Sequence, residues 1–131
     1  MKYLLDTHAW IWWNLKPESL SPKALKIVQD GRYEALLLSA ISIWEFSKLV
    51  EKRRLIISCD GREWIKQALL IPRLQVVELS PEICWLSTQL PQPFHDDPAD
   101  QIIVATARAE SATLLSADRL LRAYSHVKME W

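Results

Sequence analysis

The stretch that decides the fold is HDDPADQIIVATARAESATLLSAD, residues 95–118. Pro98 suits the first turn of a helix, and the residue before it is biased away from helical geometry. The mostly apolar residues 102–107 predict that this helix is buried on more than one side. Residues 112–116 then form an apolar run of strand length. The stretch therefore predicts a buried helix that leads directly into a buried strand.

Two carboxylates stand beside these buried elements. Asp100 falls in the first turn of the predicted helix, and Asp118 lies just past the end of the predicted strand. A carboxylate beside a buried element is costly unless it is paired, hydrogen-bonded or bound to a metal ion. Two such groups in one short span are a reason to look for further acids elsewhere in the chain.

The composition limits the class of protein. The chain has 131 residues, of which 50% are hydrophobic and 24% charged, as expected for one globular domain over residues 1–131. Its 16 basic and 16 acidic residues argue against a polyanion binder that works by bulk charge, although a local basic rim stays possible. No apolar run is long enough for a membrane span, and no signal peptide follows Met1. Cys59 and Cys84 fit no metal or redox motif and are predicted to be packing residues, so we expect a cytoplasmic protein.

Strands and helices are predicted to alternate along the whole chain. This order predicts a three-layer α/β/α sandwich with a mainly parallel central sheet, because parallel neighbours need crossover connections. Thr7 is predicted to cap the first helix, and Ser42 to begin the third. The expected strands cover residues 3–5, 35–39, 75–79, 112–116 and 127–129. The expected helices cover residues 8–14, 22–30, 42–53, 62–71, 81–90, 98–109 and 119–124.

Four acids are predicted to meet at one edge of this sheet. Asp6 and Asp118 follow strands, whereas Glu45 and Asp100 are placed in the first turns of helices. In open α/β sheets the ligand crevice lies at the carboxyl ends of the strands. Clustered carboxylates repel one another and attract a hard divalent cation, which takes oxygen ligands. The chemistry that fits is hydrolysis of a phosphodiester by a metal-activated water.

Each acid also has a local explanation that involves no ligand. Glu45 stands three residues after Ser42, which is the spacing of a capping box. Asp6 fits a turn at a strand end, Asp100 fits the positive end of a helix dipole, and Asp118 fits an N-cap. These explanations do not account for the gathering of all four acids at one predicted edge.

Four pieces of the sequence, in this order and spacing, resemble the PIN domain. Within that family they resemble the small bacterial toxin ribonucleases of the virulence-associated-protein-C type, and the resemblance covers nearly the whole chain. Each motif alone is weak, but four in order, each with its acid, are specific. The pieces are LLDTHAWIWW, LLLSAISIWEFSKL, HDDPADQIIVATA and ATLLSADRLLRAY.

The resemblance implies a Mg²⁺- or Mn²⁺-dependent endoribonuclease, the toxin of a type II toxin–antitoxin pair, that is neutralised by a small antitoxin and is expected to form a homodimer. The family's metal-binding and catalytic acids fall, residue by residue, on Asp6, Glu45, Asp100 and Asp118. The residues expected to support these acids are Thr7, Ser116 and Asp97. Many relatives have an arginine directly after the third acid, where this chain has Gln101.

Basic and aromatic residues near the acids are candidate substrate contacts. Lys48, with the basic residues 52–54, and Arg119 and Arg122 could meet RNA phosphates, although a solvated helix end explains the first group equally well. Trp10, Trp13 and Trp44 could stack on bases, but their apolar helices favour core or interface positions. Trp12, Trp64 and Trp85 are expected to reach the surface. His8 and His95 flank the acids and are read as supporting groups rather than ligands.

Three other functions compete with the ribonuclease. One is a metal-dependent phosphoesterase that uses the same acids on DNA or on a small phosphate ester. Another is a non-catalytic binding module of the same fold, against which the complete set of acids argues. A third is a phosphatase with an aspartyl nucleophile, which would need a second acid at position 8, where this chain has His8.

Overall fold

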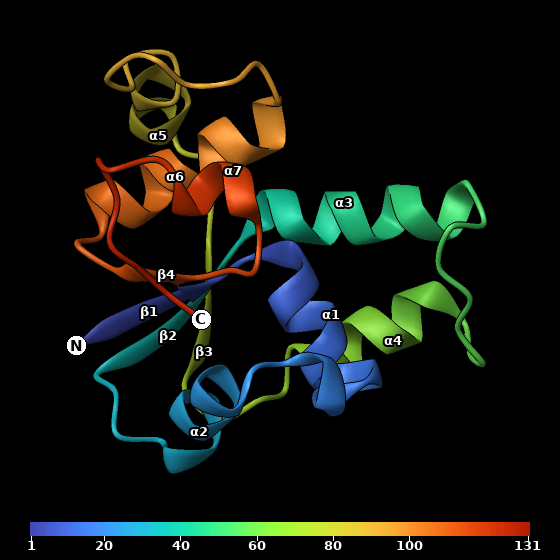
Figure 1. The fold of residues 1–131 in the computed structure, drawn as a ribbon. Helices are drawn as coiled ribbons and strands as arrows, with labels where there is room; N and C mark the ends of the chain where they lie inside the picture. Colours follow the sequence, from blue (N-terminus) through green and yellow to red (C-terminus); the bar gives the residue numbers. More distant parts are fainter.

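The computed structural model describes all 131 residues and contains one five-stranded sheet (Figure 1). Every strand pair is parallel, and the strand order is β3-β2-β1-β4-β5. The central strands are buried on both faces, which explains why they are continuous apolar runs rather than alternating ones. The strands are β1 (Lys2–Leu5), β2 (Ala35–Ser39), β3 (Leu74–Val77), β4 (Thr113–Leu115) and β5 (Met129–Glu130).

Helices connect the strands and cover both faces of the sheet, so the predicted three-layer α/β/α sandwich with a parallel sheet is confirmed. In Figure 1, α6 and α7 lie above the sheet, and α1, α2 and α4 lie below it. The helices are α1 (Thr7–Leu15), the short 3₁₀ helix η1 (Pro17–Ser19), α2 (Pro22–Asp30), α3 (Ala40–Glu51), α4 (Gly61–Ala68), α5 (Pro81–Leu86), α6 (Pro98–Ala109) and α7 (Arg119–Arg122).

Two predicted helix starts are wrong. Asp6, not Thr7, caps α1, because its carboxylate accepts the Thr7 N–H at 2.8 Å. The third helix begins at Ala40 under a Ser39 cap, so Glu45 lies in its second turn and does not form a capping box with Ser42. Both shifts have the same cause: the helix begins as soon as the buried strand ends, which leaves no room for a separate cap.

Adjacent residues of the central strands point to opposite layers. Leu4 packs in the core with Ile103 and Leu121, whereas the next residue, Leu5, packs in the other core with Trp10 and Phe46. This alternation is the period-two pattern of a strand. It locks the register of β1, because a slip by one residue would exchange the two faces.

An aromatic cluster fixes α1, α3 and α4 to one another. Trp10 is fully buried and meets Trp64 edge-on at 5.2 Å between ring centroids, while Phe46 stacks on Trp64 at 4.1 Å. The Trp10 indole Nε1 donates to the Ala68 carbonyl at 3.2 Å. Because Phe46 follows Glu45 directly, this cluster also sets where that carboxylate lies.

Some side chains differ from their predicted exposure. Trp64 is buried rather than on the surface, and Trp44 is 56% exposed rather than in the core. Cys59 and Cys84 are both exposed, so neither is a packing residue. Such exposure depends on how the helices pack. Trp44 and Phe46 are two residues apart on α3, but only the side of the helix that carries Phe46 faces the core. No helix of the structure is long and apolar enough to cross a membrane.

The topology brings distant parts of the chain to one edge of the sheet. The chain leaves β1 toward β2 and β3 and later returns to the other side of β1 as β4, so the order reverses between β1 and β4. Ligands of open α/β sheets bind at such a switch point. The helices α1, α3 and α7 start where their strands end, and α6 runs back toward the start of β4, so four helix N-termini lie at this edge.

Candidate active site

Asp6 is the most buried of the four predicted acids, with 8% of its surface exposed. Its Oδ2 accepts a hydrogen bond from the Ser116 hydroxyl at 2.6 Å, and its Oδ1 accepts the Thr7 N–H. The Ser116 Oγ in turn accepts the Asp118 N–H at 3.1 Å. Ser116 therefore connects the end of β1 to the start of α7, as expected for a residue that supports the acids.

Glu45 is held by the start of α1. Its Oε1 lies 2.5 Å from the Thr7 hydroxyl, which also lies 2.8 Å from the Ser42 hydroxyl. A hydroxyl has one proton, so Thr7 donates to the carboxylate and accepts from Ser42. Thr7 and Ser42 are both buried, and this relay between α1 and α3 fixes one oxygen of Glu45.

Asp100 is paired with a histidine from the preceding loop. The Asp100 Oδ2 lies 2.7 Å from the His95 Nε2, and the Gln101 side chain donates to the His95 carbonyl at 3.1 Å. The His95 ring also stacks on Phe94, with 4.5 Å between centroids. Gln101, which stands where many relatives have an arginine, therefore helps to hold the residue that contacts Asp100.

The remaining acids at this edge cap helices. Asp97 accepts the Ala99 and Asp100 N–H groups at the start of α6, and Asp118 accepts the Leu120 and Leu121 N–H groups at the start of α7. With Asp6 at the start of α1, three acids thus occupy N-caps, where the helix dipole favours negative charge. The cap explanation offered for Asp118 is correct, and it does not exclude a second role.

Burial and mutual repulsion raise the pKa of three of these carboxyl groups. Desolvation is the largest cause for Asp6, whose pKa is raised despite its bonds to Ser116 and Thr7. Desolvation raises the pKa of Glu45 to about 7, helped by the charges of Asp6, Asp100 and Asp97. It raises the pKa of Asp100 to about 6, opposed by the bond from His95. The three carboxyl groups are therefore harder to ionise than exposed ones, chiefly because they are buried, and shifts of this kind are common at functional sites.

The carboxylates do not converge on one point. No group of three or more His, Cys, Asp or Glu side chains is arranged to hold a metal ion in this conformation, because each acid bonds to a protein donor instead. A hard cation that keeps several waters needs only one or two of them, and the oxygen-only donor set fits Mg²⁺ or Mn²⁺.

A cavity of about 670 Å³ opens beside Glu45, and we name it the α3-side cavity. It lies between α3, the start of α1 and the start of α6. Lys48, a predicted RNA contact, is on its wall and also pairs with Glu51. The cavity is lined by Thr7, His8, Ala40, Ile41, Trp44, Glu45, Lys48, Leu49, Lys52, Arg54, Leu79, Asp97, Pro98 and Ala99.

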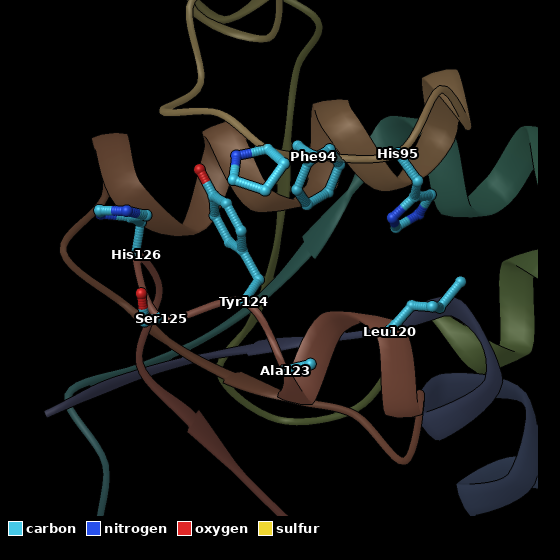
Figure 2. A pocket seen from close by; sticks show the side chains of 8 residues that line it. Phe94, His95, Leu120, Ala123, Tyr124, Ser125 and His126 are labelled. Carbon is cyan, nitrogen blue, oxygen red and sulfur yellow. The ribbon is translucent and has the colours of Figure 1, made fainter.

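A second cavity of about 470 Å³, the α7-side cavity, adjoins the acids through His95 (Figure 2). In Figure 2, Phe94, His95 and Tyr124 surround a space that is closed below by α7. Tyr124 meets Phe94 edge-on at 4.7 Å and donates its hydroxyl to the Pro91 carbonyl at 2.7 Å. The cavity is lined by Pro93, Phe94, His95, Leu120, Ala123, Tyr124, Ser125 and His126.

The other predicted RNA contacts lie farther out. Arg119 and Arg122 are exposed on α7, and Arg122 lines a separate small cavity with Lys23 and Trp131. Two contacts of the site were missed from the sequence. Ser42 was predicted only as a helix start, but its hydroxyl bonds to Thr7. The bond from His95 to Asp100 was not predicted. Ser42 and His95 both lie within the sequence motifs that carry the acids, and this was the available signal.

Comparison with known proteins agrees with this architecture. Residues 3–127 match the family model of the PIN domain. The chain is 32% identical over 123 residues to Ribonuclease VapC22 of Mycobacterium tuberculosis, with 94% of this chain and 92% of that protein covered.

Solved structures share the fold at lower identity. The VapBC2 complex of Rickettsia felis bound to a promoter DNA fragment superposes with a TM-score of 0.72 at 18% identity, over 99% of this chain and 98% of the other. FitAcB of Neisseria gonorrhoeae gives a TM-score of 0.69 at 20% identity, over 97% and 95%. The family model and the curated relative both span most of the sequence, so the chain belongs to the PIN-domain family and, within it, is of the VapC type.

Proposed function

We propose that this protein is a metal-dependent endoribonuclease that hydrolyses RNA phosphodiesters with an activated water. The observation that carries the proposal is the set of four carboxylates, Asp6, Glu45, Asp100 and Asp118, at the switch point of the sheet. Burial and, to a smaller extent, the charges of neighbouring acids raise the pKa of Asp6, Glu45 and Asp100, and a divalent cation would offset both effects. The ribonuclease name of the relative supports the same activity.

The four acids have separate roles in this proposal. Asp6 and Asp100 would hold the cation, and Asp118 and Glu45 would complete the ligand set, directly or through water. A bound Mg²⁺ or Mn²⁺ would supply an activated water and neutralise charge on the phosphoryl oxygens. Glu45 would orient the attacking water and accept its proton, because the Thr7 hydroxyl holds its Oε1 in place.

The hydrolysis needs no covalent intermediate. The water oxygen forms a bond to phosphorus as the bond from phosphorus to the leaving oxygen breaks, and the leaving oxygen takes a proton from solvent. Thr7 and Ser116 hold Glu45 and Asp6 in place, and Asp97 orders the backbone that carries Asp100.

We also propose that the ribonuclease is the toxin of a type II toxin–antitoxin pair. Support comes from the VapC name of the relative and from the solved toxin–antitoxin complexes that share the fold. The partner would then be a small antitoxin protein. A homodimer and a cytoplasmic location complete the proposal, and size-exclusion chromatography with light scattering tests the first of these.

The proposal is tested by RNA cleavage with the purified, partner-free chain. The assay runs with Mg²⁺, with Mn²⁺ and with chelator, beside Asp100→Asn prepared identically. We expect metal-dependent cleavage that falls by more than about 100-fold in the variant, beyond the loss typical of a group outside the ligand set. A melt in chelator tests folding, and Asp100→Asn should be at least as stable as the parent, because the fold disfavours the ionised carboxylate.

The same assay separates the rival functions. Cleavage of DNA or of a small phosphate ester without cleavage of RNA would indicate a different phosphoesterase. Full activity of Asp100→Asn would refute the assignment of this acid. Absence of both cleavage and metal binding by calorimetry would favour a non-catalytic binding module.

A further inference from the structure

The α3-side cavity contains a tryptophan that no structural role explains. Trp44 is 56% exposed and lines the cavity next to Glu45, whereas Trp10 and Trp64 form the core cluster. A single exposed aromatic side chain is not unusual by itself, and what distinguishes Trp44 is its position beside Glu45 and the cations around it. The Lys48 Nζ lies 6.0 Å from the centre of the Trp44 ring, so a cation stands at the same place.

Charge is distributed unevenly along this cavity. Glu45 and Asp97 stand at the end near the sheet, and Lys48, Lys52 and Arg54 follow toward the other end of α3. Lys48 is one helical turn beyond Glu45, about 4.5 Å along the axis, and Lys52 is roughly one turn further. Figure 1 shows that α3 runs outward from the sheet, so the basic end lies away from the strands.

This arrangement matches the chemistry of a nucleotide chain. The acidic end suits the phosphate that is cleaved, because a cation held by the acids would face it. The basic end suits the next phosphate, and the exposed indole beside Lys48 offers a flat apolar face for a base. A volume of about 670 Å³ lies within the usual range for ligand pockets.

We propose that Trp44, with Lys48, Lys52 and Arg54, forms a nucleotide subsite for single-stranded RNA directly beside the scissile phosphate. The subsite rests on the proposed ribonuclease function and extends it by naming a substrate-binding surface. Base stacking on Trp44 tolerates any base, since every base has a π-face. The subsite therefore contributes affinity and register on the strand more than sequence selection.

RNA fits this cavity better than a peptide partner on charge. The whole chain has a formal net charge of zero, and the three cations of the cavity lie together beyond Glu45 and Asp97. Lys48 is paired with Glu51, so Lys52 and Arg54 are the cations that this outer end offers to a polyanion. A peptide would be expected to meet a more continuous apolar groove, whereas here cations border the indole on the side away from the sheet.

The test measures binding of a fluorescein-labelled, single-stranded RNA of mixed sequence by polarisation, in chelator, so that the result does not depend on cleavage. The variants are Trp44→Ala, the conservative Trp44→Phe, and Trp85→Ala as the matched control. Trp85 is 64% exposed on α5 and lines neither cavity. Loss of one stacked base predicts a dissociation constant about 5- to 100-fold higher for Trp44→Ala. Trp44→Phe should restore most of the affinity.

The outcomes distinguish the subsite from the activity. Weaker binding by Trp44→Ala alone supports the subsite, even if no RNA is cleaved in the metal assay. Equal binding by Trp44→Ala and Trp85→Ala overturns it, and the cavity would then be a candidate surface for a protein partner. Thermal melts of all three variants exclude misfolding, which is not expected because both indoles are exposed.

Discussion

The two cavities that flank the acids use aromatic residues in opposite ways. In the α7-side cavity, Phe94 and Tyr124 pack against each other, and Tyr124 is buried and bonded to a backbone carbonyl. In the α3-side cavity, Trp44 is exposed and accompanied by cations rather than by other rings. The first arrangement holds a side chain in place, and the second offers a surface to a ligand.

The two cavities therefore have different proposed roles: the α7-side cavity positions a side chain beside the acids, and the α3-side cavity binds the RNA. His95 reaches Asp100 from the α7-side cavity, and its stacking on Phe94 limits the orientations of the imidazole. Changes on this side should therefore act on the chemical step. Changes of Trp44 and of the outer cations of the α3-side cavity should act on RNA affinity, because none of these side chains bonds to an acid of the site.

Replacement of His95 should give the larger effect. We expect His95→Ala to lower kcat by about 10- to 100-fold, as loss of a partner of a metal ligand does. The KM for RNA and the binding of RNA in chelator should stay within about threefold of the parent, because the interaction acts on Asp100 rather than on the substrate. Steady-state kinetics at saturating Mg²⁺ gives both quantities.

His126→Ala is the matched control for this prediction, since His126 lines the same cavity without contacting an acid. His95→Gln, which keeps a donor near Asp100, should recover part of the loss. Equal kcat values for His95→Ala and His126→Ala would show that the contact with Asp100 does not position it.

The acids predict an unusual pH dependence of stability in chelator. The pKa of Glu45 is raised to about 7 because the fold disfavours its ionised form, beside Asp6, Asp97 and Asp100. The contribution of Glu45 to the free energy of unfolding is complete below its ordinary pKa of 4.5 and is lost as pH rises through about 7. Between pH 5 and 8 the parent should therefore lose about 2–5 °C of Tm relative to Glu45→Gln.

Thermal melts of both proteins across this range measure the difference, because contributions from groups that do not interact with Glu45 cancel. Added Mg²⁺ should raise the Tm of the parent at pH 8 more than that of Glu45→Gln, which has lost one carboxylate. A parent that gains Tm relative to the variant as pH rises would contradict a raised pKa of Glu45.

The smallest effect is expected at the outer end of the α3-side cavity. Lys52→Gln should weaken RNA binding about two- to threefold and reduce the slope of log affinity against log salt by roughly 0.7, the value for one phosphate contact on a single strand. Polarisation titrations at several salt concentrations measure this slope. Lys66→Gln on α4, away from this cavity, is the control, and equal slopes for both variants would remove Lys52 from the subsite.

Much of the fold could be predicted from local patterns. Ser21 with Pro22 marked the start of α2, and Gly31 marked its end, where the structure has a left-handed φ of 65°. The boundaries of α1 and α3 could not be read this way. Thr7 and Ser42 look like caps in sequence, but their hydroxyls bond to each other and so join α1 to α3, although the two residues are 35 positions apart.

The sequence by itself determined the alternating elements, the parallel sheet and the edge at which the acids would stand, because apolar runs and turn residues mark each element along the chain and alternation of strands with helices requires parallel crossovers. Only the tertiary structure decided which groups hold each acid and which aromatic residues remain exposed. Residue spacing cannot show that His95 reaches Asp100, or that Trp44 faces solvent while Phe46 is buried. Those outcomes depend on how α3, α6 and α7 pack against the sheet, and packing is a property of the whole chain.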